Sequence, residues 1–265
     1  MQEISKEILK KYQVRKTRKQ KTDFIDYIKQ KYPSACVEEG GFGKNRNIVI
    51  GDLASAKAVF TAHYDTCAVL PFPNFITPKN FIIYLLYNIL IAIPFLALMP
   101  VLYCVLFALS QNFIISYYFS LAAVFGIMIY VLMLGKPNKN TANDNTSGVI
   151  ALCELMASLT EDECAKCAFV FFDNEENGLL GSSFFASLHK KEMRQKLLVN
   201  MDCVGEGNNI MFVISKKADQ FRAQLSSSFK NTENKTPLFE KAASAFYPSD
   251  QINFKTTVAV ASLSA

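Results

Sequence analysis

Imidazole and carboxylate side chains gather in four short segments of the sequence. The segments are AHYDT, with His63 and Asp65; TANDNTSG, with Asp144; FVFFDNEENGLLGS, with Glu175 and Glu176; and VNMDCVGEG, with Asp202. Imidazole nitrogens and carboxylate oxygens are ligands that Zn²⁺ uses in catalytic sites. If the segments meet in the folded chain, they can supply a metal centre and a general base.

Each segment also has a simpler interpretation, which the sequence leaves open. Asp144 stands at the head of an expected helix, where Asp, Asn, Thr and Ser serve as N-caps. Glu175 and Glu176 form either an acidic loop or a pair with divided roles. Neighbouring side chains point in different directions, so one carboxylate can bind metal while the other takes a proton from water. In the first segment, Asp65 can orient His63 by accepting its second ring N–H.

Short apolar runs predict strands that alternate with helices. Strands are expected at Asn47–Ile50, Ala58–Thr61, Ala168–Phe172 and Leu197–Met201, and helices at residues 5–31, 146–159 and 182–191. This alternation is typical of an α/β fold with a mixed, mostly parallel sheet flanked by helices. Ligands commonly lie at the carboxyl ends of strands in such sheets, and Glu175 and Asp202 follow strands in this way.

An apolar block from Phe81 to Leu134 contains no Asp, Glu, Lys, Arg or His. A membrane-spanning helix needs roughly 20 apolar residues, and the block has room for two, at residues 81–109 and 113–134. The alternative is a pair of buried core helices, but soluble helices of this length normally carry a polar face. The block therefore predicts a transmembrane helical hairpin.

Positive charges flank the apolar block, with Lys79 before it and Lys136 and Lys139 after it. The excess of lysine on both flanks places them in the cytoplasm. We expect an integral membrane protein that contacts the lipid bilayer and has a cytoplasmic catalytic domain. The expected division is a soluble domain formed by residues 1–78 and 137–265, and a hairpin at residues 79–136.

The formal net charge is +5, and much of it lies in the basic segment Lys10–Lys21, which has no acidic residue. This segment forms either a solvated helix face or a contact with anionic lipid headgroups, worth ~1 kcal/mol per basic residue near the surface. Nucleic acid is not an expected partner, because no recognisable binding module accompanies the segment. Seven scattered cysteines without an apolar leader indicate free thiols in a reducing compartment.

Taken together and in this order, the four segments resemble the motifs of the co-catalytic two-zinc aminopeptidases, the family that includes bacterial leucyl aminopeptidase and aminopeptidase Y. AHYDT resembles the first metal motif, ANDNTSG the bridging-aspartate motif, FFDNEENGLLGS the base-and-ligand motif, and NMD the next ligand. The stretch Tyr247–Asp250, YPSD, resembles the approach to the last strand. The likeness covers nearly the whole chain outside the apolar block.

The resemblance implies two zinc ions, a peptide substrate and a role for each of six side chains. The metal ligands would be His63 and Asp202 on one zinc, Glu176 on the other, and Asp144 between them. The catalytic roles would fall to Glu175, the general base, and to Asp65, which supports His63. The implied reaction is hydrolysis of an N-terminal peptide bond by a metal-activated water.

The sequence departs from the family pattern in two ways. The family has a last histidine ligand after the final strand of this stretch, but this chain has only His63 and His189. His189 lies in no ligand motif and is expected at the surface. The second zinc site therefore lacks its final ligand. Because the sequence ends in an apolar run, Val258–Ala265, we expect that the chain is truncated there. The hairpin also separates His63 from Asp144; two helices return the chain to the side that it left, so the two halves of the site can meet.

The leading hypothesis is a membrane-anchored zinc aminopeptidase. A catalytically impaired membrane scaffold, and another two-metal hydrolase such as a carboxypeptidase, remain alternatives that share the same motifs. A transporter is disfavoured, because the apolar block carries no ionisable residue to mark a pathway. The preferred substrate residue and the oligomeric state are left open by the sequence.

Overall fold

The structure is a computed structural model that describes residues 2–229 and 235–264. Contacts divide the chain into two compact units, one formed by residues 1–67 and 137–265 and the other by residues 68–136. The first unit contains the sheet and the motif residues, and the second contains the apolar block.

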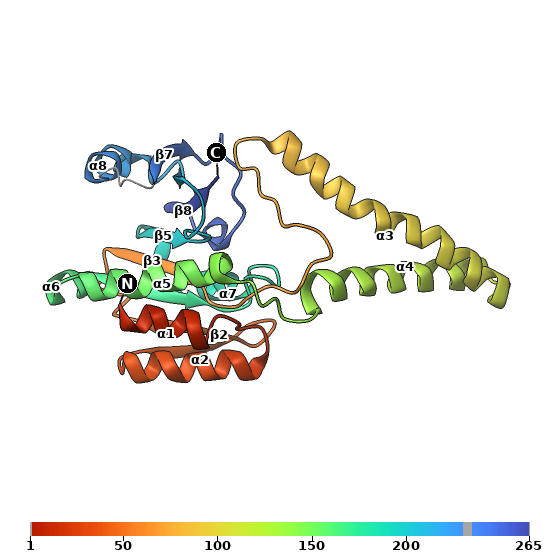
Figure 1. The fold of residues 1–265 in the computed structure, drawn as a ribbon, viewed down its shortest axis with the longest axis horizontal. Helices are drawn as coiled ribbons and strands as arrows, with labels where there is room; N and C mark the ends of the chain where they lie inside the picture. The colour runs from red at the N-terminus through yellow and green to blue at the C-terminus, as the bar shows by residue number, and fades with distance from the viewer. Residues whose placement is uncertain (1, 230–234, 265) are drawn as a thin grey trace. The chain divides into compact units, whose positions relative to one another are not determined.

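One eight-stranded sheet forms the centre of the first unit, with the order β1-β2-β4-β3-β5-β8-β6-β7 (Figure 1). Its strands are β1 (Cys36–Gly40), β2 (Asn45–Ile50), β3 (Ala58–His63), β4 (Cys167–Phe172), β5 (Leu197–Met201), β6 (Asn209–Ile214), β7 (Thr236–Lys241) and β8 (Thr257–Leu263). Strands β4, β3, β5 and β8 are parallel, whereas β2 and β6 pair antiparallel with their central neighbours. The predicted mixed, mostly parallel sheet is confirmed.

Strand β4 shows how a continuous apolar run builds a core on both faces of the sheet. Phe169 and Phe171 point to one face, and Ala168, Val170 and Phe172 point to the other. Successive side chains of a strand alternate between faces, so a strand covered on both sides is apolar throughout. The sheet is therefore the middle layer between two helical layers.

Helices α1 (Glu3–Lys11), α2 (Arg18–Lys31) and α5 (Gly148–Ser158) pack on the first face (Figure 1). The sequence predicted a single helix over residues 5–31, which is wrong, because the chain leaves helical structure at residues 12–17. Thr17 restarts it with a capping box, in which Thr17 accepts the N–H of Gln20 and the Gln20 side chain accepts the N–H of Thr17. Such reciprocal bonds satisfy backbone donors that the first helical turn leaves unpaired.

Helix α7 (Leu180–Leu188) covers the opposite face, where Phe185 packs against Phe172 and Phe254. Helix α8 (Arg222–Ser228) joins a third apolar cluster with strands β5 to β8. Short helical segments complete the unit, namely η2 (Ala142–Ser147), α6 (Glu161–Cys164), η3 (Glu192–Arg194), η4 (Asp219–Phe221) and η5 (Asp250–Asn253). Strand β8 contains most of the apolar run near the end of the sequence. It lies between β5 and β6, so this run is buried and has a neighbouring strand on each side.

The second unit is a helical hairpin formed by α3 (Phe81–Ser110) and α4 (Phe113–Ile129), with a π-helical continuation, η1 (Tyr130–Leu134). Gln111 takes a left-handed conformation at the turn, and the Asn112 side chain accepts the N–H of Ile115 at 3.1 Å, which caps α4. These boundaries lie within one residue of the two helices expected from the sequence.

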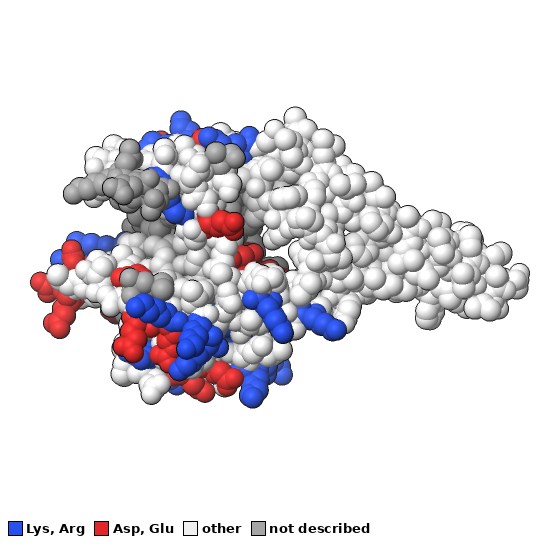
Figure 2. All heavy atoms as spheres, viewed as in Figure 1, with Lys and Arg blue, Asp and Glu red and all other residues white. Residues whose placement is uncertain are grey.

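Small polar side chains lie between the two helices, and large apolar ones face outward. Ser116 and Ser120 are fully buried, and the hydroxyl oxygens of Ser110 and Ser116 lie 2.9 Å apart. Small residues at such interfaces allow close approach of helix backbones. Both helices are long and apolar enough to cross a membrane, and Figure 2 shows no charged atoms on their visible face.

Phe24 of α2 tests the packing of the first helical layer. It is fully buried, and its ring lies 5.4 Å from that of Tyr64 and 6.2 Å from that of Phe171. Phe24→Ala is expected to lower the free energy of unfolding by about 3–5 kcal/mol, because it removes a buried ring and leaves a cavity. Denaturant unfolding of the purified chain measures the change. The exposed Leu188→Ala is the control, and equal losses in the two variants would contradict this role of Phe24.

Candidate metal centre

Three neighbouring parallel strands end at one edge of the sheet and bring most of the motif residues there. His63 is the last residue of β3, Asp173 follows β4, and Asp202 follows β5. The β3–β5 register pairs Thr61 with Asn200 and, two residues further, leads to His63 and Asp202. The buried Thr61 hydroxyl donates to Asn200 Oδ1 at 2.8 Å. This bond fixes the register on which the approach of the two ligand groups depends.

Asp144 reaches the same edge from η2, the turn before α5. Asn145 holds this turn, because its Nδ2 donates to the carbonyl oxygen of Met201 at 3.0 Å. Its Oδ1 accepts the N–H groups of Gly148 and Cys203 at 3.0 and 3.1 Å. A Cβ at Gly148 would lie 2.3 Å from the Met201 carbonyl oxygen, so only glycine permits this approach. The Asn145 side chain thus binds the start of α5 and the end of β5. The neighbouring Asp144 side chain points toward the other motif residues.

The motif side chains converge on the His63 imidazole. His63 Nε2 lies 3.4 Å from Asp144 Oδ1 and 3.5 Å from Asp202 Oδ1. Ligand atoms of His63, Asp144 and Glu176 lie within 4.8 Å of one another, and so do those of His63, Glu175 and Asp202. Zinc ligands lie roughly 2 Å from the ion, so such spacing allows one ion to touch every member of a group.

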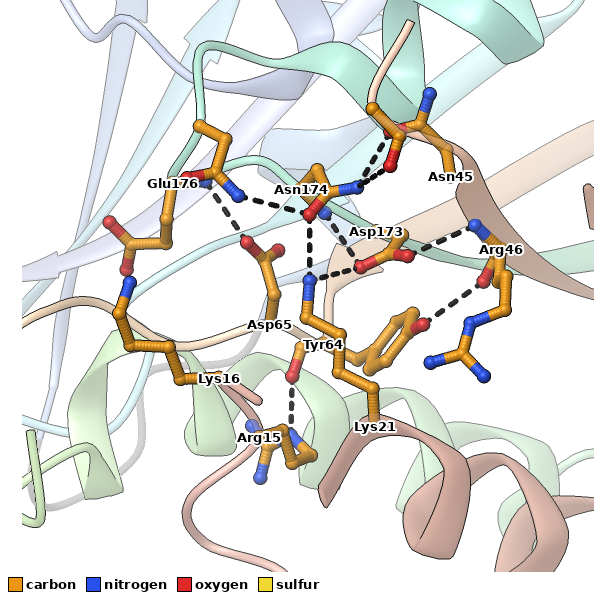
Figure 3. A network of polar contacts seen from close by, with 12 residues as sticks. Arg15, Lys16, Lys21, Asn45, Arg46, Tyr64, Asp65, Asp173, Asn174 and Glu176 are labelled. Carbon is orange, nitrogen blue, oxygen red and sulfur yellow. Dashed lines mark hydrogen bonds and ion pairs between the residues drawn. The ribbon is translucent and has the colours of Figure 1, made fainter. Parts of the chain in front are cut away.

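Asp65 connects the His63 strand end to the acidic loop after β4 (Figure 3). Its carboxylate accepts the backbone N–H of Glu175 at 2.9 Å and that of Glu176 at 3.2 Å. Its Oδ1 lies 3.6 Å from His63 Nδ1, while its own carbonyl oxygen lies closer to that nitrogen, at 3.1 Å. Asp65 therefore orients the backbone of the Glu175–Glu176 pair, a contact that the sequence did not reveal.

Two buried carboxylate oxygens of this cluster lack a donor among the described residues. They are Glu176 Oε1 and Asp202 Oδ1. A buried acceptor without a partner is costly, and an adjacent divalent cation removes that cost. The donor set of one imidazole and several carboxylates is one that zinc accepts. The residues present thus suit a bound metal.

The electrostatics of the cluster reflect several acids crowded around one base. Burial raises the pKa of Glu175 and of Glu176 well above the ordinary value, and neighbouring carboxylates raise both further. Burial alone would lower the pKa of His63, but the negative charges of Glu175, Asp144 and Asp202 raise it well above its usual value. In the metal-free protein Glu175 and Glu176 therefore tend to keep protons, which a bound cation would displace.

Asp250, at the start of η5, is a member of this charged environment that the sequence analysis did not assign to the site. It is fully buried, and both of its carboxylate oxygens lack a hydrogen-bond partner among the described residues. Burial raises its pKa to about 7, while the nearby His63 charge opposes the rise. The only signal in the sequence for Asp250 was an acidic residue in the YPSD stretch before a buried strand.

Cys203 is a second residue near the site that the sequence did not indicate. Its sulfur lies within 4.8 Å of ligand atoms of Asp144 and Asp202.

Part of the basic segment Lys10–Lys21 lies inside the protein, beneath the metal centre. Arg15 is fully buried and Lys21 is 6% exposed, so neither a solvated helix face nor a lipid contact describes these two residues. Lys21 Nζ donates to Asp173 Oδ1 at 2.5 Å (Figure 3). The interpretations of this segment that assumed exposure are wrong for Arg15 and Lys21. Lys21 pairs with the buried Asp173, and Arg15 donates to the carbonyl oxygen of Tyr64 and to the hydroxyl of Thr146.

His189 takes no part in the cluster. Its Nε2 lies 2.9 Å from Glu38 Oε1, and its ring packs 4.5 Å from that of Phe185. It is partly buried rather than free at the surface. Among the described residues, His63 alone supplies an imidazole to the ligand groups.

The fold and the clustered side chains define a mixed α/β protein with metal-ligand groups at the carboxyl edge of its central strands. The sequence pattern of peptidase family M28 matches residues 129–265, about half of the chain. The chain belongs to this family. A comparison with the sequences of curated proteins gives no match.

Solved structures share the fold at low sequence identity. The LapA aminopeptidase of Legionella pneumophila matches with a TM-score of 0.53 and 14% identity, over 98% of this chain and 58% of that one. LapB of the same organism matches with a TM-score of 0.50 and 14% identity, over 98% and 60% of the two chains. The chain thus spans about three fifths of the length of these relatives, and the likeness establishes the fold.

Asp250 gives the metal-free protein a specific pH dependence. Its pKa is about 7 in the folded state and roughly 3.9 in an unfolded chain. The folded state therefore holds the proton more tightly, and ionised Asp250 destabilises it increasingly as pH rises through this window. Asp250→Asn is expected to raise the melting temperature of chelator-treated protein more at pH 8 than at pH 5, as thermal unfolding can show. The exposed Asp162→Asn is the control, and an equal change at both pH values would refute this assignment.

Proposed function

We propose that this protein is a membrane-anchored, zinc-dependent aminopeptidase. The observation that carries the proposal is the convergence of His63, Asp144, Glu176 and Asp202, from four separate segments, on one point at the sheet edge. Membership of peptidase family M28 supports peptide hydrolysis, and the LapA aminopeptidase shares the fold.

The clustered residues are proposed to hold two ions. His63 and Asp202 would hold one zinc, Glu176 would hold the other, and Asp144 would lie between them. Bound zinc supplies Lewis-acid polarisation of the scissile carbonyl and makes water more acidic at neutral pH. The partnerless oxygens of Glu176 and Asp202 are the groups that this arrangement would satisfy.

Glu175 is the proposed general base. Its carboxylate would take the proton of the attacking water and pass it to the leaving amine. Burial first, and neighbouring carboxylates next, raise the pKa of Glu175 well above its ordinary value, and a general base works best when its pKa is raised toward the operating pH. Asp65 fixes the Glu175 backbone N–H at 2.9 Å, so the loop that carries the base and the ligand Glu176 is held at both backbone amides.

Glu175→Gln tests this function. The variant is expected to lower kcat for aminoacyl reporter substrates by about 10²–10⁴-fold while zinc content stays near that of the wild type, because Glu175 acts on a proton rather than on the ion. Asp144→Asn should lose zinc and activity together, and the exposed Glu161→Gln should change neither. Wild-type protein that binds no zinc and releases no amino acid would support a scaffold instead.

The apolar hairpin of residues 81–134 is proposed to be the membrane anchor. Its outward side chains are large and apolar, including Leu86 at 59%, Leu96 at 67% and Phe119 at 66% exposed. A soluble surface does not normally expose an apolar area of this extent. Lysines lie on the flanks, and the turn at Ser110–Asn112 is uncharged, so the flanks and the sheet unit are proposed to be cytoplasmic.

Membrane insertion can be tested on the full chain. It is expected to stay with membranes after alkaline carbonate washing and to be released by detergent. An epitope tag inserted between Gln111 and Asn112 should be accessible only from the non-cytoplasmic side, whereas a tag at the N-terminus should be accessible only from the cytoplasm. Release by carbonate would contradict insertion, and the opposite pattern of tags would contradict the orientation.

A further inference from the structure

The connection between α1 and α2 runs directly beneath the metal centre and contacts two of its loops. Gln13 O accepts the hydroxyl of Thr141 at 2.7 Å and that of Thr146 at 3.3 Å. Thr141 and Thr146 flank Asp144 in the chain. The N-terminal segment therefore docks on the turn that supplies this ligand, although it contains no motif residue itself.

Arg15 joins the two ligand-bearing loops from this connection. Its Nε donates to the carbonyl oxygen of Tyr64, which lies between His63 and Asp65. Its Nη1 donates to Thr146 Oγ1 at 3.1 Å, and its backbone N–H donates to Thr66 Oγ1 at 3.0 Å. A planar guanidinium fixes several acceptors in one geometry, so Arg15 sets the spacing between the loop of His63 and the turn of Asp144.

Lys21 acts on the third loop, the one that follows β4 (Figure 3). Its Nζ donates to Asp173 Oδ1 at 2.5 Å and to Asn174 Oδ1 at 2.7 Å. Asp173 also accepts the backbone N–H of Arg46 at 3.0 Å and that of Asn174 at 2.9 Å. Glu175 is the next residue, so Lys21 and Asp65 hold the two sides of the loop that presents Glu175 and Glu176.

We propose that Arg15 and Lys21 are positioning residues of the metal centre, which set the geometry of its ligand loops without touching metal or substrate. The inference rests on the proposed function and extends it to a segment outside the family match, which begins at residue 129. Both residues also place buried positive charge beneath a cluster of buried acids.

A positioning role differs from a purely structural one in its effect on the bound metal. Hydrogen-bond partners of metal ligands typically change metal affinity or activity by about 10–100-fold when they are removed. A purely structural residue would instead lower the melting temperature and leave the metal affinity of the folded protein unchanged. Cobalt is a useful probe, because its visible absorption reports ligand geometry.

The experiment titrates cobalt into the full, detergent-solubilised chain, well below the melting temperature of each variant. Arg15→Lys keeps the charge but removes the planar guanidinium, and Lys21→Met removes the charge. Both variants should weaken cobalt binding by about 10–100-fold and alter the visible spectrum of the bound cobalt. If Lys21→Met does not fold, the double variant Lys21→Met with Asp173→Asn removes the unpaired buried acid as well and should show the same change. Lys21→Arg, which keeps a cation, should restore most of the affinity.

Matched controls come from basic residues with similar bonds elsewhere in the sheet unit. Lys196 donates to the carbonyl oxygens of Ala54 and Ala56, and Arg222 bonds Asp219 and the carbonyl oxygen of Phe239. Lys196→Met and Arg222→Lys should leave cobalt affinity and spectrum unchanged. If the Arg15 and Lys21 variants bind cobalt like these controls, the positioning role is overturned while the proposed function stands; if the wild type binds no cobalt, both are overturned.

Discussion

The structure depends on one electrostatic constraint, which is that several carboxylates are buried around a single imidazole. His63, Asp65 and Asp202 are each at most 6% exposed, and Glu175 and Glu176 approach the same point. Like charges in a poorly solvated site cannot all ionise without compensation. Retained protons, nearby basic side chains or a bound divalent cation can each compensate the negative charge. The raised pKa values correspond to retained protons, and the inward-facing Arg15 and Lys21 are the nearby basic side chains. The partnerless acceptor oxygens correspond to a bound cation.

The scaffold places the acidic groups with hydrogen bonds to backbone groups and between uncharged side chains. Asp65 is held close to the amides of Glu175 and Glu176, Asn145 ties the Asp144 turn to the end of β5, and Thr61 fixes the register between β3 and β5. Each contact joins segments that are distant in sequence. The acidic groups are therefore placed by the sheet and its loops, and Glu176 Oε1 and Asp202 Oδ1 keep no hydrogen-bond donor among the described residues.

Insertion of the apolar hairpin does not disturb the sheet unit, because the chain leaves and re-enters that unit at adjacent points. The backbone N–H of Asn138 donates to the carbonyl oxygen of Cys67 at 3.1 Å, and Asn138 Nδ2 contacts Cys67 Sγ at 3.4 Å. Closing a long loop whose ends are already fixed together adds little cost as the loop lengthens. His63 and Asp144 can therefore be separated by the whole hairpin in sequence and still lie 3.4 Å apart.

The sequence by itself determined the central strands, the two apolar helices and the six motif residues, because each has a local signature: an apolar run, a long uncharged stretch, or an acidic group after a strand. It did not determine the break between α1 and α2, the burial of Arg15 and Lys21, or the presence of Asp250 near the site. Apolar residues at helical spacing stand on both sides of residues 12–17, so the break between them has no clear signal. A basic run resembles a solvated surface when the residues that bind it are distant in the sequence. Only the tertiary structure brings Asp173, Tyr64 and Thr146 to these residues, since hydrogen bonds between distant segments leave no pattern in the sequence on either side.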